Sequence, residues 1–332
     1  MRDAGTTLTC ALALLAAALG LACIPRQRPA QPLSTLRAFA MPARAQCAGA
    51  YGLPETVAAL VAEDLAEVSG MVASARNAGV LWLHNDSGSD ATLFAVSTTG
   101  AALGSLSLPG VAAEDFEDLA AAPCPDLVSA CLYVCDCGDN ELSRASLVVY
   151  AVLEPEVGVD RPLPEGSAAQ QTWRFDLALP EGPANIEAFV VLPDASAMVF
   201  FEKQRSEARV LRLPAPWRLG ESNALELAGL ITSPGEDIEG GGVITDADLH
   251  PSGERLLLRT YVGVFEARLS PGTPDGPSVD SVDAADFLEL FRPTDEPQGE
   301  AIAYDEQGTG IWTISEDPER SGNQPLHHAG CL

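Results

Sequence analysis

An acidic residue followed by a short apolar run recurs five times along this chain, at intervals of about 50 to 70 residues. Repetition at this period, with several short strands and Gly- or Pro-containing turns in each unit, is typical of a β-propeller. The sequence therefore predicts an all-β fold, a single propeller of five blades, with room for a sixth in residues 140–180 or 220–242. The five repeats are Glu67-Val68-Ser69-Gly70-Met71, Glu117-Asp118-Leu119-Ala120, Glu187-Ala188-Phe189-Val190, Asp246-Ala247-Asp248-Leu249 and Glu300-Ala301-Ile302-Ala303.

Turn residues divide each of the first four units into four predicted strands. The fifth unit has only two, residues 301–304 and 310–315. We therefore expect residues 56–64 to complete the last blade, because a closed ring leaves no exposed strand edges. The strands predicted in the first four units are 68–74, 80–84, 92–97 and 103–108; 119–122, 132–135, 147–152 and 172–179; 188–192, 198–202, 209–213 and 225–230; and 243–249, 255–259, 264–269 and 287–290.

The repeated acids are expected to converge, because the first strand of each propeller blade lines the central channel. In the fourth unit the pattern fits Asp246 and Asp248 equally well. A second set of polar residues follows the second strand of each unit, and we expect it to join the acids at one mouth of the channel. This set is His84-Asn85-Asp86, Cys135-Asp136, Glu202-Lys203-Gln204, Arg259-Thr260 and Ser315-Glu316-Asp317.

Carboxylates that crowd together either take up protons or are neutralised by a cation. Calcium accepts about six to eight oxygen ligands from carboxylates, amides and carbonyls in loose geometry. The sequence thus predicts a Ca²⁺ site in the channel. The alternative interpretation is that the acids accept hydrogen bonds from backbone N–H groups of the adjacent blade. The predicted metal ligands are Glu67, Asn85, Asp136, Glu187 and Glu300.

Acidic residues greatly outnumber basic ones in this chain, with 47 Asp and Glu against 19 Lys and Arg and a formal net charge of -28. Such a surface repels a phosphate backbone, so the composition excludes nucleic-acid binding. The same charge attracts divalent cations and cationic partners.

An export signal is predicted for residues 1–22, because Leu12–Leu21 is an apolar run too short to span a bilayer. Cys23 follows a small residue, as in a bacterial lipoprotein signal, and is predicted to carry a lipid. Residues 23–50 are expected to form a disordered tether and residues 51–332 the propeller. We expect an exported monomer, held by its lipid at the outer membrane or in the periplasm; plain secretion is the alternative.

Six cysteines lie beyond the export segment, and an even number in an exported chain predicts disulfides. We expect Cys124 to pair with Cys131 across a short turn. Cys47 is expected to pair with Cys331, which would tie together the two ends of the ring.

Four segments resemble the blade motifs of a group of bacterial exported propellers, written HNDSG, DWED, GDIGDN and QGEAI. These segments are Trp82–Gly88, Asp115–Asp118, Gly138–Asn140 and Pro297–Ala303. The chain is more remotely similar to phytase-like (esterase-like) and gluconolactonase-like propellers, in which channel acids bind calcium. The resemblance therefore implies a propeller fold and calcium in its channel.

Cys135 and Cys137 stand where that group of propellers tends to have Gly and Ile. Because the two cysteines are two residues apart, they fall on one face of a strand, where each is predicted to bond to a neighbouring strand. Their departure from the motif implies a disulfide particular to this lineage. Zinc binding by clustered cysteines is the alternative, although the C-x-C spacing is atypical for it.

Three functions are consistent with these features. The first is a calcium-dependent hydrolase that acts on a phosphoester or lactone-like ester, with Glu117 or Glu187 activating water. The second is a non-catalytic cell-surface platform that binds a protein or a glycan, since a propeller fold by itself does not define an activity. The third is a glycoside hydrolase that uses channel carboxylates, which an aromatic content of 6% disfavours. The sequence leaves the choice between enzyme and platform open.

Overall fold

The computed structural model describes Cys47 and residues 50–60, 65, 67–88, 90–205, 207–237, 241–270, 278–294, 296, 298–316 and 324–332. The predicted export signal, the lipidated Cys23 and nearly all of the predicted tether lie outside these residues. Within them, no helix has the length and apolar character needed to cross a bilayer. The described chain is all-β, and its one short 3₁₀ helix is Ala284–Asp286.

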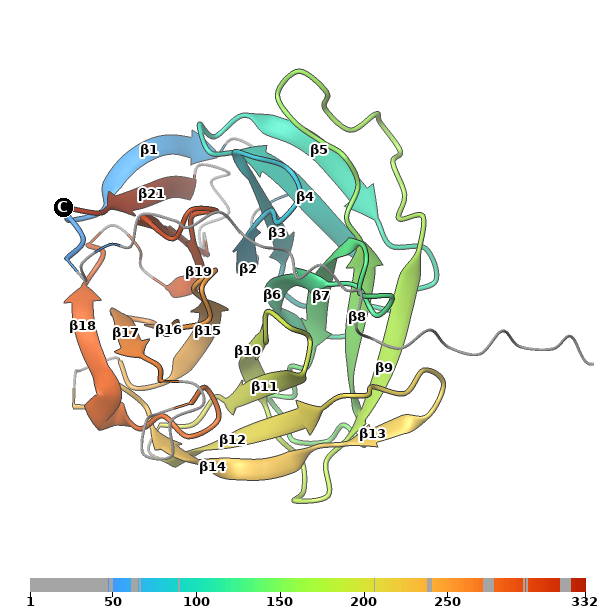
Figure 1. The fold of residues 1–332 in the computed structure, drawn as a ribbon, viewed down its shortest axis with the longest axis vertical. Coiled ribbons are helices and arrows are strands. Elements are labelled where there is room, and N and C mark those ends of the chain that lie inside the picture. The colour runs from blue at the N-terminus through green and yellow to red at the C-terminus, as the bar shows by residue number, and fades with distance from the viewer. Residues whose placement is uncertain are drawn as a thin grey trace, which may run out of the picture. The chain divides into compact units, whose positions relative to one another are not determined.

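Five sheets radiate around a common axis, as Figure 1 shows, so the predicted five-bladed propeller is confirmed. The segments with room for a sixth blade supply strands to existing blades instead. The first blade contains β2 (Val68–Ala73), β3 (Val80–Asn85), β4 (Thr92–Ser97) and β5 (Ala102–Ser107). The second contains β6 (Phe116–Pro123), β7 (Ala130–Asp136), β8 (Leu147–Leu153) and β9 (Thr172–Ala178), with the short β13 (Ser222–Ala224) parallel to β9 at its outer edge.

The remaining blades follow the same plan from the axis outward. The third contains β10 (Ile186–Val191), β11 (Ala197–Glu202), β12 (Glu207–Pro214) and β14 (Glu226–Thr232). The fourth contains β15 (Ile244–Leu249), β16 (Arg255–Thr260), β17 (Val264–Arg268) and β18 (Phe287–Phe291). The fifth contains β19 (Gly299–Tyr304), β20 (Gly310–Ser315), β21 (Gln324–Gly330) and, outermost, β1 (Glu55–Leu60).

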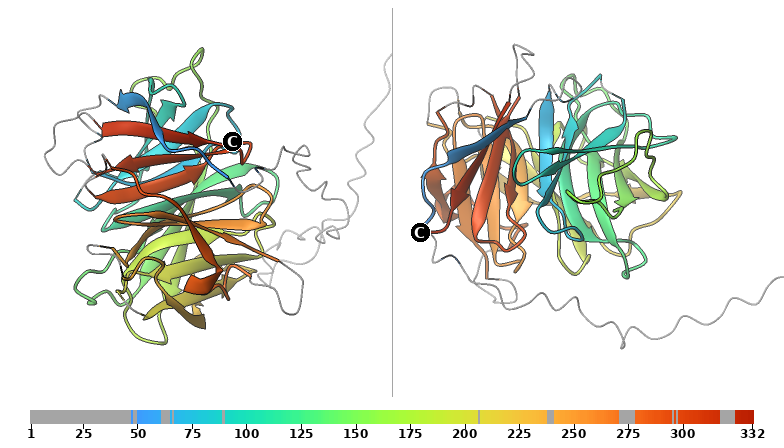
Figure 2. Two further views of the ribbon diagram at one scale, coloured as in Figure 1. Left: turned by 90° about the vertical axis from the view of Figure 1, so that its left-hand side faces the viewer. Right: turned by 90° about the horizontal axis from the view of Figure 1, so that it is seen from above.

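The N-terminal strand closes the ring. Strand β1 pairs antiparallel with β21, and both views in Figure 2 show the blue β1 beside the red β21. The closing strand predicted for residues 56–64 is thus confirmed, although residues 61–64 lie outside the described part of the chain. The inner strands β2, β6, β10, β15 and β19 contact one another in that order, and β19 returns to β2.

The hydrophobic core lies between neighbouring blades, where alternate residues of one sheet pack against the next. Each of five buried clusters joins two adjacent blades. Representative pairs are Trp82 and Leu119, Tyr133 and Phe189, Phe201 and Leu258, Leu257 and Tyr304, and Ile314 and Met71. Apolar packing therefore holds each blade to its neighbour around the ring.

Three disulfides are present, and two of them are the predicted pairs. Cys47 bonds to Cys331, and Cys124 bonds to Cys131. The prediction that Cys135 and Cys137 each bond to a neighbouring strand is wrong, because they bond to each other. Strand β7 ends between them, and their Cα atoms are 5.1 Å apart, closer than the roughly 6.6 Å of residues two apart in a strand. The bend of the chain therefore brings the two sulfurs together.

Candidate functional site

A β-bulge interrupts the inner strand at the equivalent position of every blade. A bulge adds one residue that has no partner on the next strand and redirects its side chain. The register shifts between Val68 and Gly70, Phe116 and Asp118, Ile186 and Ala188, Ile244 and Asp246, and Gly299 and Ala301. The extra residues are therefore Ser69, Glu117, Glu187, Thr245 and Glu300.

In the first and fourth blades the bulge residue carries a hydroxyl group that joins its blade to the next one. Ser69 Oγ donates a hydrogen bond to the backbone oxygen of Glu117 at 2.8 Å. Thr245 Oγ1 donates to the backbone oxygen of Gly299, also at 2.8 Å. The acids that the sequence repeat placed here, Glu67 in the first blade and Asp246 or Asp248 in the fourth, are therefore not bulge residues.

In the other three blades the bulge residue is a buried glutamate, and all three glutamates line one cavity of about 230 Å³. The predicted convergence of Glu117, Glu187 and Glu300 is therefore what the fold produces. Residues that follow the second strands complete much of the wall, as the second polar set predicted. Asp86 after β3, Lys203 after β11 and Glu316 after β20 belong to that set. In the fourth blade the wall residue is Tyr261 after β16, which the set did not include.

Other acids of the inner strands hold neighbouring blades together, which is the role offered as the alternative in the sequence. Asp118, Asp246 and Asp248 accept hydrogen bonds from backbone N–H groups of the next blade. Both acids of the fourth unit are therefore structural. The three contacts, each 2.7 Å, run from Phe189 N to Asp118 Oδ2, from Ile302 N to Asp246 Oδ2 and from Tyr304 N to Asp248 Oδ2.

The side chains of Asp118 and Asp246 also interact with each other, and both are fully buried. Two carboxylates cannot both be acceptors, so one of them holds a proton. Burial raises the pKa of each of the two carboxyl groups well above the ordinary value for aspartate. Asp118 accepts backbone hydrogen bonds from Leu119 and Phe189, whereas Asp246 accepts one from Ile302. The less supported carboxylate, Asp246, therefore carries the shared proton.

We expect Asp246→Asn to remove part of the pH dependence of stability. The raised pKa of Asp246 means that the folded protein keeps a proton that the unfolded chain releases above pH 3.8. The contribution of this group to the unfolding free energy is therefore fully present at low pH and is lost as pH rises. The loss is roughly 1.4 kcal/mol for each unit by which the pKa in the folded state exceeds that in the unfolded state. An asparagine amide can donate to Asp118 at every pH. Denaturation measured between about pH 4 and pH 8 should show that the unfolding free energy of the variant rises relative to that of the wild type as pH increases. If the unfolding free energies of the two proteins changed with pH in parallel, the shared proton would be contradicted.

Three carboxylates gather beside the cavity. Single oxygens of Asp86, Asp115 and Glu117 all lie within 4.8 Å of one another. Gly138 lies against two of them, since a Cβ there would collide with Glu117 Oε1 and Asp115 Oδ2. A side chain at position 138 would therefore displace the cluster. We call these three acids the carboxylate triad.

Electrostatics in the triad favour a bound cation. Burial raises the pKa of Glu117 well above its usual range, and the charges of Glu187, Asp86 and Asp115 raise it further. Burial likewise raises the pKa of Asp86, and it raises that of Asp115 to about 6 with help from Asp86 and Glu187. Lys203 lowers the pKa of Glu117 and Asp86 but does not offset these effects. A divalent cation would supply the missing positive charge.

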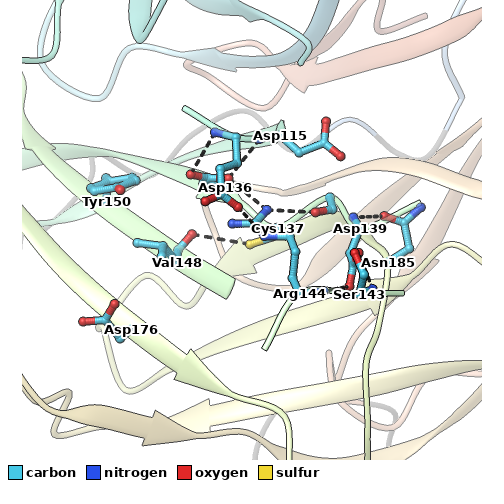
Figure 3. Close-up of polar contacts among 12 residues, drawn as sticks. Asp115, Asp136, Cys137, Asp139, Ser143, Arg144, Val148, Tyr150, Asp176 and Asn185 are labelled. Carbon is cyan, nitrogen blue, oxygen red and sulfur yellow. Dashed lines mark hydrogen bonds and ion pairs between the residues drawn. The ribbon is translucent and has the colours of Figure 1, made fainter. Parts of the chain in front are cut away.

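Asp136, a predicted metal ligand, instead supports the loop that carries Asp115 (Figure 3). Its Oδ1 accepts a hydrogen bond from Asp115 N at 3.0 Å, and its Oδ2 accepts one from Glu114 N at 3.3 Å. Arg144 Nη1 lies 3.0 Å from Asp136 Oδ1 and donates to the backbone oxygen of Gly138 at 2.8 Å. Arg144 and Asp136 together thus hold the backbone at Glu114, Asp115 and Gly138.

The structure brings only some of the predicted metal ligands to the cavity. Glu187 and Glu300 line the cavity, whereas Glu67, Asn85 and Asp136 are not in its wall as far as the described residues form it. Asn85 Oδ1 accepts a hydrogen bond from Glu67 N at 3.2 Å, which joins the two residues at the entry to β2. Sequence reasoning missed two triad residues, Asp86 and Asp115, as ligands. Their signal was present, because each lies inside one of the segments that resemble blade motifs.

The third blade contributes an ion pair to the wall of the cavity. Lys203 Nζ lies 2.9 Å from Glu187 Oε2 and 5.1 Å from the centre of the Tyr261 ring. Asn185 Nδ2 donates to Glu187 Oε1 at 2.9 Å. Burial opposes the charge of Lys203, but the carboxylates of Glu187 and Glu300 raise its pKa above the ordinary value. Lys203 is therefore a fixed cation of the cavity wall.

Glu300 is the least satisfied acid of the cavity. Gln298 Nε2 donates to Glu300 Oε1 at 3.0 Å and also to Glu316 Oε2, so one amide holds two carboxyl groups together. Glu300 Oε2 is buried and accepts no hydrogen bond from the described residues. Burial raises the pKa of Glu300 to about 8, against the lowering effect of Lys203. A cation placed beside Oε2 would favour the ionised form.

Comparison with known proteins adds little to this description. No protein-family model matches the chain, and no curated protein matches it. Among solved structures, it is similar to a luciferin-regenerating enzyme, with 10% sequence identity over 84% of this chain and 96% of the other and a TM-score of 0.42. Similarity at that level carries no information about activity. Fold and site together define an acidic five-bladed propeller with a carboxylate-lined cavity.

Proposed function

We propose that this protein is a calcium-dependent hydrolase that cleaves small esters at one mouth of its propeller. The observation that supports this most directly is the carboxylate triad, three acids with raised pKa values and oxygens within 4.8 Å of one another beside the cavity. The blade motifs, which resemble those of exported propellers and more remotely those of phytase-like and gluconolactonase-like propellers, support calcium in the channel.

The triad fits a hard cation. Asp86, Asp115 and Glu117 offer only oxygen atoms, which suit Ca²⁺ or Mg²⁺ and not a metal that prefers sulfur or nitrogen. Calcium takes about six to eight oxygens at flexible geometry, so water and other wall oxygens, such as the amide of Asn140, would complete its coordination. Magnesium demands a stricter octahedral arrangement, which makes calcium the better match.

Glu187 is the proposed general base. A bound Ca²⁺ would polarise the ester carbonyl next to the triad. Glu187 lines the same cavity, and its carboxylate is held in place by Lys203 and Asn185. It would take a proton from the attacking water, whose oxygen adds to the carbonyl carbon. The bond from that carbon to the alcohol oxygen then breaks, and the alcohol leaves with a proton, so that ester and water give acid and alcohol.

Activity on small carboxylic esters and δ-lactones, measured with calcium and with EGTA, tests the proposal. We expect hydrolysis that EGTA abolishes, and we expect Glu187→Gln to lower kcat by at least about 100-fold, the effect of losing a general base. Hydrolysis that is unaffected by EGTA would contradict the proposal. Calcium binding without turnover of any substrate would favour the alternative, a cell-surface platform for a protein or a glycan.

The proposal includes the export and lipid anchoring that the sequence predicts. Residues 1–22 would be the signal, Cys23 the lipidated residue and the segment up to residue 50 the tether. Calcium is plentiful outside the cytoplasm, so an exported protein could hold an ion of moderate affinity.

A further inference from the structure

We infer that the cavity selects esters that carry a primary ammonium group, bound between Glu300, Glu316 and Tyr261. The ester carbonyl would then face the carboxylate triad. Only the position of the carbonyl rests on the proposed function, because the recognition of the ammonium group concerns the other half of the wall.

The cavity has two acidic halves with one ion pair between them. The triad comes from the first and second blades, whereas Tyr261, Glu300 and Glu316 come from the fourth and fifth. The third blade, which lies between the second and the fourth around the ring, supplies the Lys203–Glu187 pair. A metal ion at the triad therefore leaves the second half in need of its own cation.

The charge of the wall disfavours an anionic substrate. Five carboxyl groups of the lining face a single ammonium, that of Lys203, which is already paired with Glu187 at 2.9 Å. With a divalent ion bound, the formal charge of the lining is still negative. A phosphate dianion would be repelled, whereas a cationic substrate would be attracted.

The unpartnered oxygen of Glu300 shows which cation fits. Gln298 directs its amide nitrogen, which cannot coordinate a metal, at both Glu300 and Glu316. A second metal ion would compete with this donor for the same oxygens. A primary ammonium has three N–H donors and could bond to Glu300 Oε2 and still leave Oε1 to the amide.

Tyr261 completes the recognition of an ammonium group. Its ring already lies 5.1 Å from Lys203 Nζ, within the distance of about 6 Å for a cation–π contact. Tyr261 and Glu300 line the same cavity, and burial followed by the charge of Glu300 raises the pKa of Tyr261. At about 230 Å³ the cavity is smaller than the roughly 300–1,000 Å³ of sites for drug-sized ligands. Esters the size of a simple amino-acid ester match it.

Binding of n-butylammonium to the calcium-loaded protein tests the inference without requiring turnover. In calorimetry it should bind about 10- to 100-fold more tightly than n-butanol, the range for a hydrogen bond to a charged group, and butyrate should bind most weakly. Glu316→Gln should weaken n-butylammonium by about 10-fold, whereas Glu226→Gln on the exposed face of β14 should change nothing. Equal binding of the amine and the alcohol would overturn the inference.

A matched pair of substrates separates this inference from the proposed function. Alanine ethyl ester and ethyl isobutyrate differ by an ammonium in place of a methyl group, and we expect kcat/KM to favour the former by at least about 10-fold. Hydrolysis of both esters at equal efficiency would refute the ammonium site and leave the hydrolase. Binding of n-butylammonium without any hydrolysis would support the site and refute the hydrolase. If the protein bound a second calcium ion, and Glu316→Gln abolished that binding, the ammonium site would be refuted.

Discussion

Glu117→Gln is expected to weaken calcium binding by at least about 100-fold while the propeller stays folded. The glutamine keeps the size of the side chain at the bulge but removes one of the three charges of the carboxylate triad. Two unit charges about 4 Å apart interact by about 4 kcal/mol at an effective dielectric constant of 20, and a 100-fold change requires about 2.7 kcal/mol. Calorimetric titration with calcium measures the loss directly.

The same variant should gain stability when calcium is absent. Burial and the charges of Glu187, Asp86 and Asp115 all disfavour an ionised Glu117, so a neutral amide relieves that cost. In EGTA the midpoint of thermal unfolding should therefore equal or exceed that of the wild type, while the rise on adding calcium should be smaller. The matched control is Glu55→Gln on the exposed face of β1. If the calcium affinity of Glu117→Gln were within about threefold of that of the wild type, the triad would be excluded as the calcium-binding site.

The architecture was predictable because each blade repeats one pattern. Apolar runs bounded by Gly, Pro, Asn and Asp turns mark strands whichever blade they belong to. Two strands were missed for different reasons. Strand β21 is built on Gln324, Pro325, His327 and His328, a composition that resembles a loop although all four residues are buried or half-buried. Strand β13 has three residues and pairs with β9 of a different blade, which no local pattern can indicate.

The candidate site was predictable only where the acid stands at the bulge. Glu117, Glu187 and Glu300 are followed by apolar runs, so the start of the inner strand was clear. A bulge moves the register by one residue and leaves no mark in hydrophobic periodicity. The repeat consequently aligned acids in the first and fourth blades with positions that hold Ser69 and Thr245.

Loop residues were the main omission. Asp86 follows β3 and Asp115 precedes β6, and the packing of the first blade against the second brings them to Glu117. Their approach depends on a glycine at position 138 and on the support of Asp136 beneath the loop. Both are tertiary contacts between segments of different strands, so the sequence could place Asp86 near the repeated acids but could not indicate that Asp115 meets it there.

Glu296→Ala is expected to cost about 3–5 kcal/mol of unfolding free energy, as the loss of one partner of a buried ion pair does. Glu296 Oε2 pairs with Arg259 Nη2, and both side chains are fully buried. Thr313 Oγ1 donates to Glu296 Oε1 at 2.5 Å. Removing the carboxylate would leave a buried guanidinium without its counter-charge. Chemical denaturation in EGTA measures the loss without interference from calcium binding.

A double replacement distinguishes the burial of charge from the loss of packing. Arg259→Met with Glu296→Leu removes both charges and keeps apolar volume, so it should recover most of the stability. Glu289→Ala, which breaks the exposed pair with Arg292, should cost far less. A loss at Glu296 no greater than at Glu289 would contradict this account. Because Gly299 lies against the Arg259 guanidinium, the buried pair also supports the strand that carries Glu300, and its loss should weaken n-butylammonium binding as well.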